Sequence, residues 1–366
     1  MIGWLVRLAG ALLSLVGFCC PYFSAVAEDD GTEWRVRYSE ASNLPPEAAD
    51  RLVAADKESI TIKRNVDRPP DNNARIIGGV AVELKNFPDV VRIRFTNPRG
   101  RHTCTGVLLS SDAILTAGHC GCGRNYEASI QTSPVETGVE QAFKPLTLAG
   151  GPILFPGYRC YGPDGSGIGR DLALLRVVPL EAVDGGGFNF RGTRVLIQFP
   201  TIRSTIRVLS DEGLRSLFIV GFGTTESGTV AQNLQGANIG LISRHCVKGH
   251  VFLSFCASFR EFAMGRPRAS GVPADSCGGD SGAPAYRMDT DIELDTTASV
   301  TTSVSQRTLV GIVSRALAGV VHPYKDYCGG GGIYTAVGTR PVLEWLRTQN
   351  VNFAYDENPN YDPERG

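Results

Sequence analysis

The segment Gly278-Gly279-Asp280-Ser281-Gly282 places one serine among glycines, and this arrangement decides how the chain is interpreted. Glycines let a backbone turn sharply and approach a ligand closely, so the Ser281 hydroxyl and the amides beside it can face one site. A nucleophile next to backbone N–H groups suits acyl transfer, in which those groups stabilise the developing oxyanion. The N–H groups of Gly279 and Ser281 are the natural oxyanion donors.

A serine nucleophile also needs a base, and the base needs a group that orients it. His119 ends the apolar segment LTAGHC (115–120), where the neighbouring cysteine can fix the imidazole through a disulfide. Asp171 opens the apolar run DLALLRV (171–177), where a buried carboxylate requires a partner. The chain therefore offers a nucleophile, a base, an orienting carboxylate and oxyanion donors.

Short alternating segments around these motifs indicate a mainly β body. Val91–Phe95 and Thr205–Leu209 switch between apolar and polar residues, which predicts half-buried strands. The 43 glycines favour turns and loops over long helices. A helix is expected from Pro341 to Arg347, where Thr339 can cap and the proline opens the first turn.

The beginning of the chain predicts export. An apolar run, Leu8–Phe18, follows one cation and ends near Ala25-Val26-Ala27, which indicates a signal peptide over residues 1–27. One alternative is a membrane anchor, although the run is shorter than the ~20 residues that span a bilayer. Another is lipid attachment at Cys19 or Cys20, whose neighbours are poor for such a site. We therefore expect secretion, into the periplasm if the source is bacterial.

Cysteine and charge counts narrow the class of protein further. Eight cysteines remain after residue 27, and an even number in an exported chain favours disulfides. Zinc is the alternative, but Cys120-Gly121-Cys122 is tighter than the usual metal spacing, and we expect no metal. The 36 basic and 37 acidic side chains balance, which argues against nucleic acid as the main partner.

Several segments together resemble those of one enzyme family. They are Arg75-Ile76-Ile77-Gly78-Gly79, LTAGHC (115–120), DLALL (171–175), GGDSGAP (278–284), Gly311-Ile312-Val313-Ser314 and Gly332-Ile333-Tyr334-Thr335. In this order they resemble the chymotrypsin/trypsin family of serine proteases, peptidase S1, over residues 76 to about 350. The resemblance implies an all-β fold: two antiparallel six-stranded β-barrels with the active site between them, and a C-terminal helix.

The resemblance also implies a role for each motif residue. Ser281 attacks the substrate carbonyl, His119 takes and later returns the proton, and Asp171 holds the imidazole. Cleavage after Arg75 frees an ammonium on Ile76 that pairs with the buried Asp280, so the uncut chain is a zymogen. The alternative is that Arg75 is an ordinary solvated loop arginine.

Substrate preference follows from the residues that correspond to the family's primary pocket. Asp275 stands where trypsin-like members place a carboxylate at the pocket floor, which favours cleavage after arginine or lysine; otherwise it is a surface aspartate in a displaced loop. The family's usual Ser-Trp-Gly edge is Ser314-Arg315-Ala316 here, so an aromatic shelf is lost and a cation is gained. Arg315 is expected to disfavour basic substrate residues or to pair with acidic ones. The expected substrate-binding residues are Asp275, Ser276, Ser314, Arg315, Ala316 and Gly332.

The resemblance selects the disulfide pairs and the domain boundaries. It implies that Cys104 pairs with Cys120, Cys246 with Cys256 and Cys277 with Cys328, which leaves Cys122 and Cys160 as an additional pair. The expected divisions are a signal peptide (1–27), a pro-segment (28–75) with a short helix over Glu47–Lys57, a protease domain (76–350) and a polar tail (351–366). Surface insertions are expected over Gly162–Gly167 and Asp289–Ser305.

The sequence thus predicts a secreted serine endopeptidase that acts on protein or peptide substrates without a cofactor. The mature form is expected to be a monomer that does not bind membranes, and its partners include an activating protease unless the chain cleaves itself. Two alternatives stay open. One is a related protease of different or broad specificity, and the other is a catalytically silent relative that acts as a binding protein.

Overall fold

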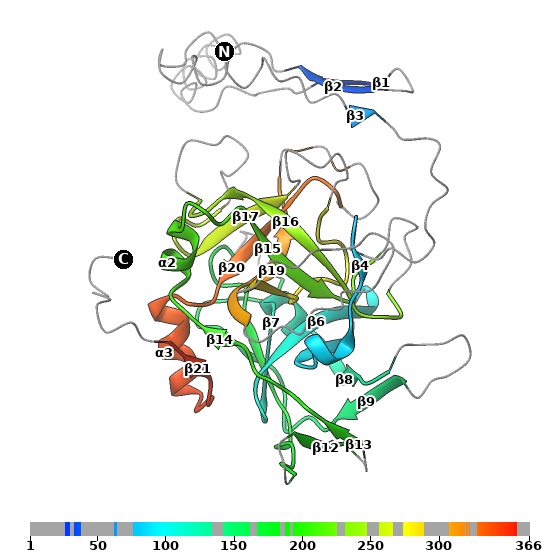
Figure 1. The fold of residues 1–366 in the computed structure, drawn as a ribbon, viewed down its shortest axis with the longest axis vertical. Helices are drawn as coiled ribbons and strands as arrows, with labels where there is room; N and C mark the ends of the chain where they lie inside the picture. Colours follow the sequence, from blue (N-terminus) through cyan, green and yellow to red (C-terminus); the bar gives the residue numbers. More distant parts are fainter. Residues whose placement is uncertain are drawn as a thin grey trace, which may run out of the picture. The chain divides into compact units, whose positions relative to one another are not determined.

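The computed structural model describes two compact units of the chain, Met1–Asp71 and Asn72–Gly366 (Figure 1). In the first unit, β2 (Glu33–Arg37) pairs antiparallel with both β1 (Val26–Asp29) and β3 (Ile62–Lys63). The described residues are 26–29, 33–37, 62–63, 76–133, 142–161, 167–183, 187–190, 193–224, 231–246, 256–265, 274–288, 307–318, 320, 322 and 328–356. Most of the expected signal peptide, the helix over Glu47–Lys57, residue 75 and nearly all of both insertions lie outside these residues.

The first half of the second unit is a closed antiparallel barrel. Its strands are β5 (Val90–Asn97), β6 (Gly100–Ser110), β7 (Ala113–Thr116), β8 (Arg124–Gln131), β9 (Phe143–Leu146) and β11 (Ala173–Arg176). They are hydrogen-bonded in the order β11-β7-β6-β5-β8-β9. A bridge between Leu148 and Val177, just beyond β9 and β11, closes the ring. The short β10 (Ile153–Leu154) adds an extra strand beside β11.

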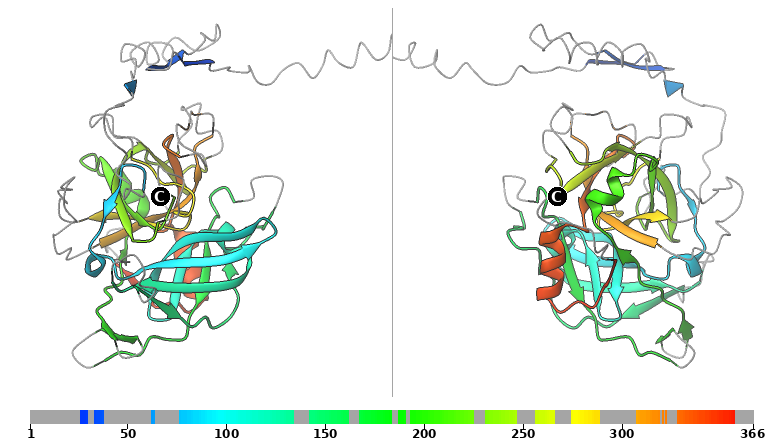
Figure 2. Two further views of the ribbon diagram at one scale, coloured as in Figure 1. Left: turned by 90° about the vertical axis from the view of Figure 1, so that its right-hand side faces the viewer. Right: turned by 60° about the vertical axis from the view of Figure 1, so that its left-hand side comes forward.

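The second half forms another ring of six antiparallel strands. They are β15 (Ser216–Gly221), β16 (Gln235–Ser243), β17 (Glu261–Gly265), β18 (Pro284–Met288), β19 (Arg307–Ala316) and β20 (Gly332–Ala336). The order is β15-β16-β17-β20-β19-β18, and β18 closes the ring by pairing with β15. Figure 2 shows the two barrels packed together, the first mainly cyan and the second green to orange. The predicted two-barrel fold is therefore confirmed.

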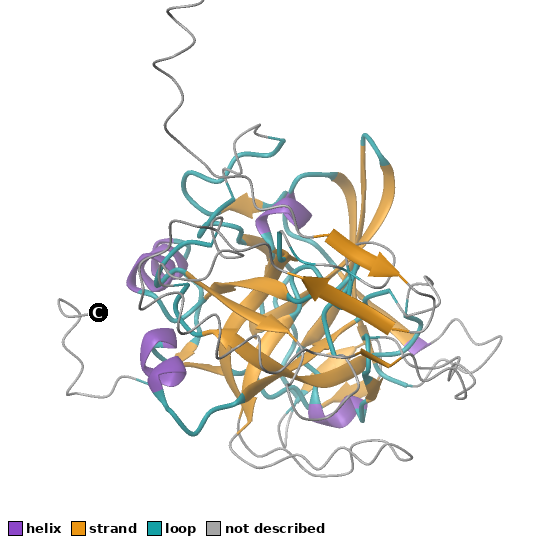
Figure 3. Ribbon diagram, turned by 90° about the horizontal axis from the view of Figure 1, so that it is seen from above, coloured by secondary structure: helices purple, strands orange, loops and turns teal. Residues whose placement is uncertain are grey.

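Five further short strands and two 3-10 turns of the second unit lie outside the two rings. They are β4 (Val80–Ala81), β12 (Phe188–Phe190), β13 (Thr193–Val195), β14 (Thr201–Ile202), η1 (Leu84–Asn86) and η2 (Gly118–Gly121), together with β21 (Ala354–Tyr355) at the end of the described chain. β14 runs parallel to both β19 and β21. Strands predominate in the view of Figure 3.

Burial along β5 follows the alternation that predicted it. Val91, Ile93 and Phe95 point into the core of the first barrel, whereas Arg92 and Arg94 are partly or fully exposed. Burying an apolar side chain of this size stabilises the folded state by about 1.5–3 kcal/mol. The strand is therefore held in one register, because a slip by one residue would bury the arginines.

Residues 205–210 correct one sequence expectation, because they form a short helix, α2 (Thr205–Ser210), and not a strand. Its buried residues are Thr205, Val208 and Leu209, which are spaced as on one face of a helix. The Thr205 hydroxyl donates to the Val310 carbonyl (2.9 Å) and so secures the helix to β19. Five residues were too few to distinguish alternation from a helical period.

The predicted C-terminal helix is confirmed as α3 (Arg340–Thr348). Thr339 occupies the N-cap position, although its side chain makes no capping hydrogen bond. Trp345 of α3 packs edge-on against Phe155, so the helix that follows the second barrel covers the first. Neither helix among the described residues is long and apolar enough to cross a membrane.

A buried ion pair joins the two barrels. Arg307 of β19 donates to Asp89, which immediately precedes β5, at 2.6 Å, and both side chains are almost fully buried. The Tyr286 hydroxyl donates to the other oxygen of Asp89 at 2.6 Å. Arg307 also donates to the carbonyls of Asn86 and Gln198. Burial raises the pKa of Asp89, and Arg307 opposes that shift.

Replacing Arg307 with methionine should lower the free energy of unfolding by about 3–5 kcal/mol, because Asp89 would stay buried without its cation. Urea unfolding with the disulfides intact measures this loss. Arg340→Met is the matched control, since it removes an exposed pair with Glu344 and should cost less than about 1 kcal/mol. Equal losses in the two variants would show that the buried pair does not join the barrels as described.

Candidate active site

Strand pairing brings His119 and Asp171 together. β7 and β11 are antiparallel, and Thr116 at the end of β7 lies opposite Ala173 at the start of β11. His119 follows β7 in the turn η2, and Asp171 precedes β11 by two residues. In an antiparallel pair, the end of one strand and the beginning of its neighbour lie at the same end of the sheet. The two side chains therefore meet although 52 positions separate them.

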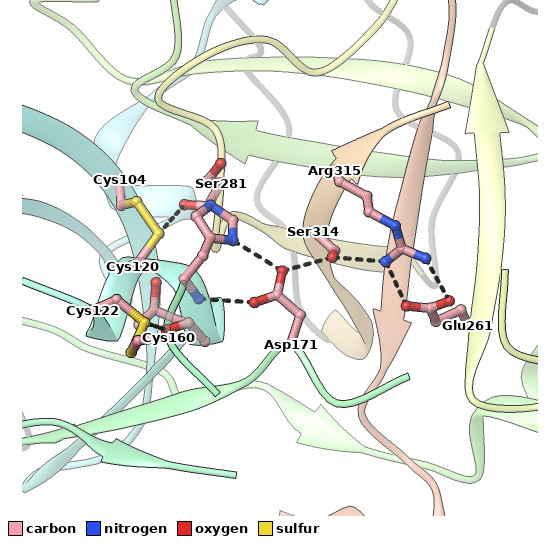
Figure 4. Close-up of polar contacts among 12 residues, drawn as sticks. Cys104, Cys120, Cys122, Cys160, Asp171, Glu261, Ser281, Ser314 and Arg315 are labelled. Atoms are coloured by element: carbon pink, nitrogen blue, oxygen red, sulfur yellow. Dashed lines mark hydrogen bonds and ion pairs between the residues drawn. A yellow bond between two sulfur atoms is a disulfide. The ribbon is translucent and has the colours of Figure 1, made fainter. Parts of the chain in front are cut away.

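The Asp171 carboxylate accepts hydrogen bonds from His119 and Ser314, and Figure 4 draws them as dashed lines. The Nδ1 of His119 lies 2.9 Å from Oδ2, and the backbone N–H of His119 donates to Oδ1 at 2.8 Å. The Ser314 hydroxyl donates to Oδ2 at 2.7 Å. Asp171 is only 4% exposed, whereas the His119 side chain is 39% exposed. The imidazole is thus held on its Nδ1 side and can reach a ligand with Nε2.

The pKa values of these two groups move in opposite directions. Burial alone would raise the pKa of Asp171, but the charge and hydrogen bonds of His119, with the Ser314 bond, lower it overall. Burial alone would lower the pKa of His119, but the charge and hydrogen bond of Asp171 raise it overall. Arg315 acts on His119 in the lowering direction. Asp171 is therefore the ionised partner, and Nδ1 is the donor of the bond between them.

Main-chain contacts place Ser281 beside the turn that carries His119. The Ser281 carbonyl accepts from the Thr105 N–H at 2.9 Å and lies 3.6 Å from Cys120 Sγ. Gly282 has φ +84°, and a Cβ there would lie 2.1 Å from both the Thr105 carbonyl and the Thr116 hydroxyl. Only glycine fits this close approach. Within the described chain, no hydrogen bond joins the Ser281 hydroxyl to the imidazole, a bond that often tightens only when substrate binds.

The backbone around Ser281 leaves two N–H groups available. Gly279 has φ +95°, and its carbonyl accepts from the Thr105 hydroxyl at 3.0 Å. The Asp280 N–H donates to the Cys277 carbonyl at 2.9 Å. The N–H groups of Gly279 and Ser281 donate to no other group among the described residues. These two amides are the expected oxyanion donors.

Asp280 lies buried below this loop. Its Oδ1 accepts from the Gly223 N–H at 2.8 Å and its Oδ2 from the Cys277 N–H at 2.9 Å. Burial raises the pKa of Asp280 to about 7, and the two backbone hydrogen bonds only partly offset this. Ile76 is fully buried in the core of the second barrel.

The residues expected to bind substrate are brought together near β20. The Asp275 carboxylate is buried and accepts from the N–H groups of Gly329 and Gly331 at 2.8 and 2.9 Å. The Tyr334 hydroxyl donates to Ser276 Oγ at 3.2 Å. A Cβ on Gly332 would lie 3.1 Å from that oxygen, so the Gly332 backbone lies close to the Ser276 hydroxyl. Ala316 is the last residue of β19 and pairs with Gly332 of β20.

One residue of this region, Glu261, was missed by the sequence analysis. It pairs with Arg315 through both carboxylate oxygens, at 2.6 and 2.9 Å (Figure 4). The cation at the expected cleft edge is thus matched by a buried anion. The only available signal was an acidic residue at the start of the apolar segment Glu261–Gly265.

Four disulfides connect the pairs that the resemblance implied. All eight cysteines after residue 27 are used, so their sulfurs are not thiolates that a zinc ion could bind. Cys122–Cys160 joins the turn after His119 to the loop before Asp171. The pairs are Cys104–Cys120, Cys122–Cys160, Cys246–Cys256 and Cys277–Cys328.

The two-barrel fold and this site are typical of the serine protease class, and comparison with known proteins shows the family. A family model described as Trypsin matches residues 76–345, well over half of the chain, and the chain therefore belongs to the trypsin family, peptidase S1.

Individual relatives are similar over more than half of this chain. The chain is 28% identical to trypsin iota of Drosophila melanogaster, over 57% of this chain and 73% of that protein. It is 27% identical to a trypsin-like protease of Streptomyces glaucescens, over 59% of this chain and 68% of the relative. It is 25% identical to the human chymotrypsin-like elastase family member 1, over 59% of this chain and 77% of that protein.

Replacing Asp171 with asparagine should lower the pKa of His119, because the charge of Asp171 stabilises the protonated imidazole. An NMR titration of the histidine side chains in both proteins measures this shift. His245, whose pKa is lowered by burial and by Arg244, is the internal control and should titrate alike in the two proteins. An unchanged titration of His119 would contradict the pairing.

Proposed function

We propose that this chain is a secreted serine endopeptidase, made as a zymogen and activated by cleavage after Arg75, that cleaves peptide bonds after arginine or lysine. The observation that carries the proposal is the hydrogen-bonded chain from His119 through Asp171 to Ser314, beside a glycine loop with two available amides. This arrangement supplies a base, its orienting carboxylate, a nucleophile and oxyanion donors at one place.

The chemistry follows from the direction of these hydrogen bonds. With Nδ1–H donated to Asp171, the basic nitrogen of His119 is Nε2, which takes the Ser281 proton as Oγ attacks the substrate carbonyl. The oxyanion that forms accepts from the N–H groups of Gly279 and Ser281. Nε2 then gives its proton to the leaving amine, and water repeats the cycle on the acyl-enzyme. The charge of Asp171 stabilises the imidazolium in both halves of the reaction.

The buried carboxylate of Asp275 supports the proposed preference for basic residues. A substrate arginine or lysine that reaches this carboxylate would match its charge, whereas an acidic or apolar side chain would not. Gly332 and Ser276 add little bulk on the way to it. The Gly329 and Gly331 amides hold one oxygen of Asp275 in a fixed position.

The environment of Asp280 supports activation by cleavage. In the uncut chain its pKa is about 7, so the carboxyl group is partly protonated at neutral pH. A new ammonium on Ile76 would pair with the ionised carboxylate and stabilise the loop that carries Asp280 and Ser281. Ile76 is already buried in the same barrel. Activation would come from another protease or from the enzyme itself.

The four disulfides fit an oxidising compartment outside the cytosol. They accord with the leader expected over residues 1–27 and with secretion. We infer that the mature protein acts as a monomer on protein or peptide substrates. Neither a membrane nor a nucleic acid is required for the proposed reaction, and no cofactor enters it.

Ser281→Ala should lower kcat by about 10⁶-fold, because the nucleophile is lost. Both proteins are compared on a peptide library after cleavage after Arg75. N-terminal sequencing of the active parent tests the activation step separately: it should start at Ile76, and a start at another residue would contradict that step. A variant with near-native turnover would contradict the catalytic assignment.

Labelling with a fluorophosphonate separates an enzyme from a silent relative that only binds proteins. The cut parent should be labelled, and Ser281→Ala should not. A parent that is neither labelled nor active would favour the binding protein.

Asp275→Ser should lower kcat/KM for substrates cleaved after arginine or lysine by about 100- to 1000-fold, because the substrate cation would lose its buried partner. The measurement is the ratio of kcat/KM between basic and apolar peptides, which is insensitive to partial loss of active protein. Asp211→Ser, which removes an exposed pair with Arg287, is the control and should keep the parental ratio. An unchanged arginine preference in Asp275→Ser would refute this pocket and leave a different or broad specificity.

A further inference from the structure

An ion pair that is not part of the expected triad lies next to it. Glu261 begins β17 and is fully buried, and Arg315, near the end of β19, has a side chain that is 30% exposed. β20 lies between these two strands, with Thr335 opposite Glu261 and Ile333 opposite Arg315. The guanidinium therefore reaches across one strand to meet the carboxylate with two parallel hydrogen bonds (Figure 4).

Glu261 is held by four donors from three segments. Besides the two nitrogens of Arg315, the Gly169 N–H donates to Oε1 and the Ala257 N–H donates to Oε2, each at 2.7 Å. Gly169 lies two residues before Asp171, in the turn closed by the bond from the Arg170 N–H to the Gly167 carbonyl. The carboxylate thus ties the turn that leads into Asp171 to the second barrel.

Arg315 also contacts the hydroxyl that donates to Asp171. Its Nη1 lies 3.2 Å from Ser314 Oγ, and a guanidinium has donors only. Ser314 Oγ must therefore accept from Arg315, so its single hydrogen is left to donate to Asp171 at 2.7 Å. The donors run in one direction, from Arg315 through Ser314 to the carboxylate that orients His119.

We propose that Arg315 and Glu261 form a positioning pair for Asp171, in which Glu261 fixes the turn before the aspartate and Arg315 orients the Ser314 hydroxyl toward it. This role rests on the proposed peptidase function, and it belongs to residues that touch no reacting atom. It also gives Arg315 a use other than contact with substrate, because Glu261 matches its charge.

The charges around His119 give this pair a measurable signature. Burial and Arg315 lower the pKa of His119, and Asp171 raises it. Tyr158, the remaining titratable side chain that contacts Asp171, has a raised pKa and is neutral over the working range. Removing Arg315 should therefore raise the pKa of His119. Removing the negative charge of Glu261 should lower it, because the charge of Arg315 would no longer be matched.

The test measures kcat, KM and the pH dependence of kcat/KM for the protein cut after Arg75. Arg315→Met should lower kcat by about 10- to 100-fold, since small displacements of a catalytic group have effects of this size, with KM changed less than threefold. The acid limb of the pH profile of kcat/KM, which reports the protonation of His119, should move to higher pH in Arg315→Met and to lower pH in Glu261→Gln. Arg315→Lys keeps the charge and should restore the position of the limb but not the full kcat.

Arg340→Met, which removes an exposed arginine that also pairs with a glutamate, is the matched control and should leave both kcat and the limb unchanged. Variants that keep the parental kcat and acid limb would overturn the proposal. So would limbs that move in the same direction in Arg315→Met and Glu261→Gln, as expected from general loosening of the site.

The outcome is separable from that of the proposed function. An inactive parent would refute the peptidase itself, whereas an active parent with unaffected variants would refute only the pair. If Arg315→Met does not fold, the pKa of His119 is measured by NMR titration in Glu261→Gln, in the Ser281→Ala background, where it should fall, and Arg315→Lys, which keeps the charge, should titrate like the parent. An unshifted His119 titration in Glu261→Gln would also overturn the proposal.

Discussion

The buried carboxylate of Asp171 is the constraint on which the arrangement of the two barrels depends. An ionised group at this depth is tolerated only when donors surround it. Those donors come from both halves of the molecule: His119 from the first barrel, through its backbone and its ring, and Ser314 from the second. Docking of the barrels removes water from the carboxylate and supplies these donors in its place, and the ionised group then holds the imidazole in one orientation.

The same physical rule recurs at four other buried carboxylates. Asp89 joins β19 to the chain before β5, and Glu261 joins three segments next to the site. Asp280 connects the Ser281 loop to the chain after β15. Asp275 connects the chain before that loop to the glycines after Cys328, and its own N–H bonds to the Ile77 carbonyl. Buried carboxylates thus connect loops that lie outside the regular hydrogen bonding of the sheets.

Much of this fold could be predicted from short motifs, because the chemistry at Ser281 and His119 demands particular residue types among glycines and cysteines. Long alternating strands such as β5 were predictable for a similar reason, since burial imposes their period. The helix α2 was not, because its six residues carry almost no periodic signal. The role of Glu261 was not predictable either, since it depends on the register of three strands that are adjacent only in the folded chain. Two-residue strands such as β10 depend on pairing with a neighbour that is distant in the sequence, here β11, and leave no mark in the sequence.

The disulfide Cys122–Cys160 gives the site a mechanical property. It links the turn after His119 to Cys160, whereas the hydrogen bonds of Asp171 link His119 itself to the carboxylate. The segment with His119 is therefore attached to the chain around Asp171 at two separate positions, one covalent and one hydrogen-bonded. A covalent crosslink keeps the two segments neighbours even when the hydrogen bonds break, so the contact between the imidazole and the carboxylate can re-form after a local opening.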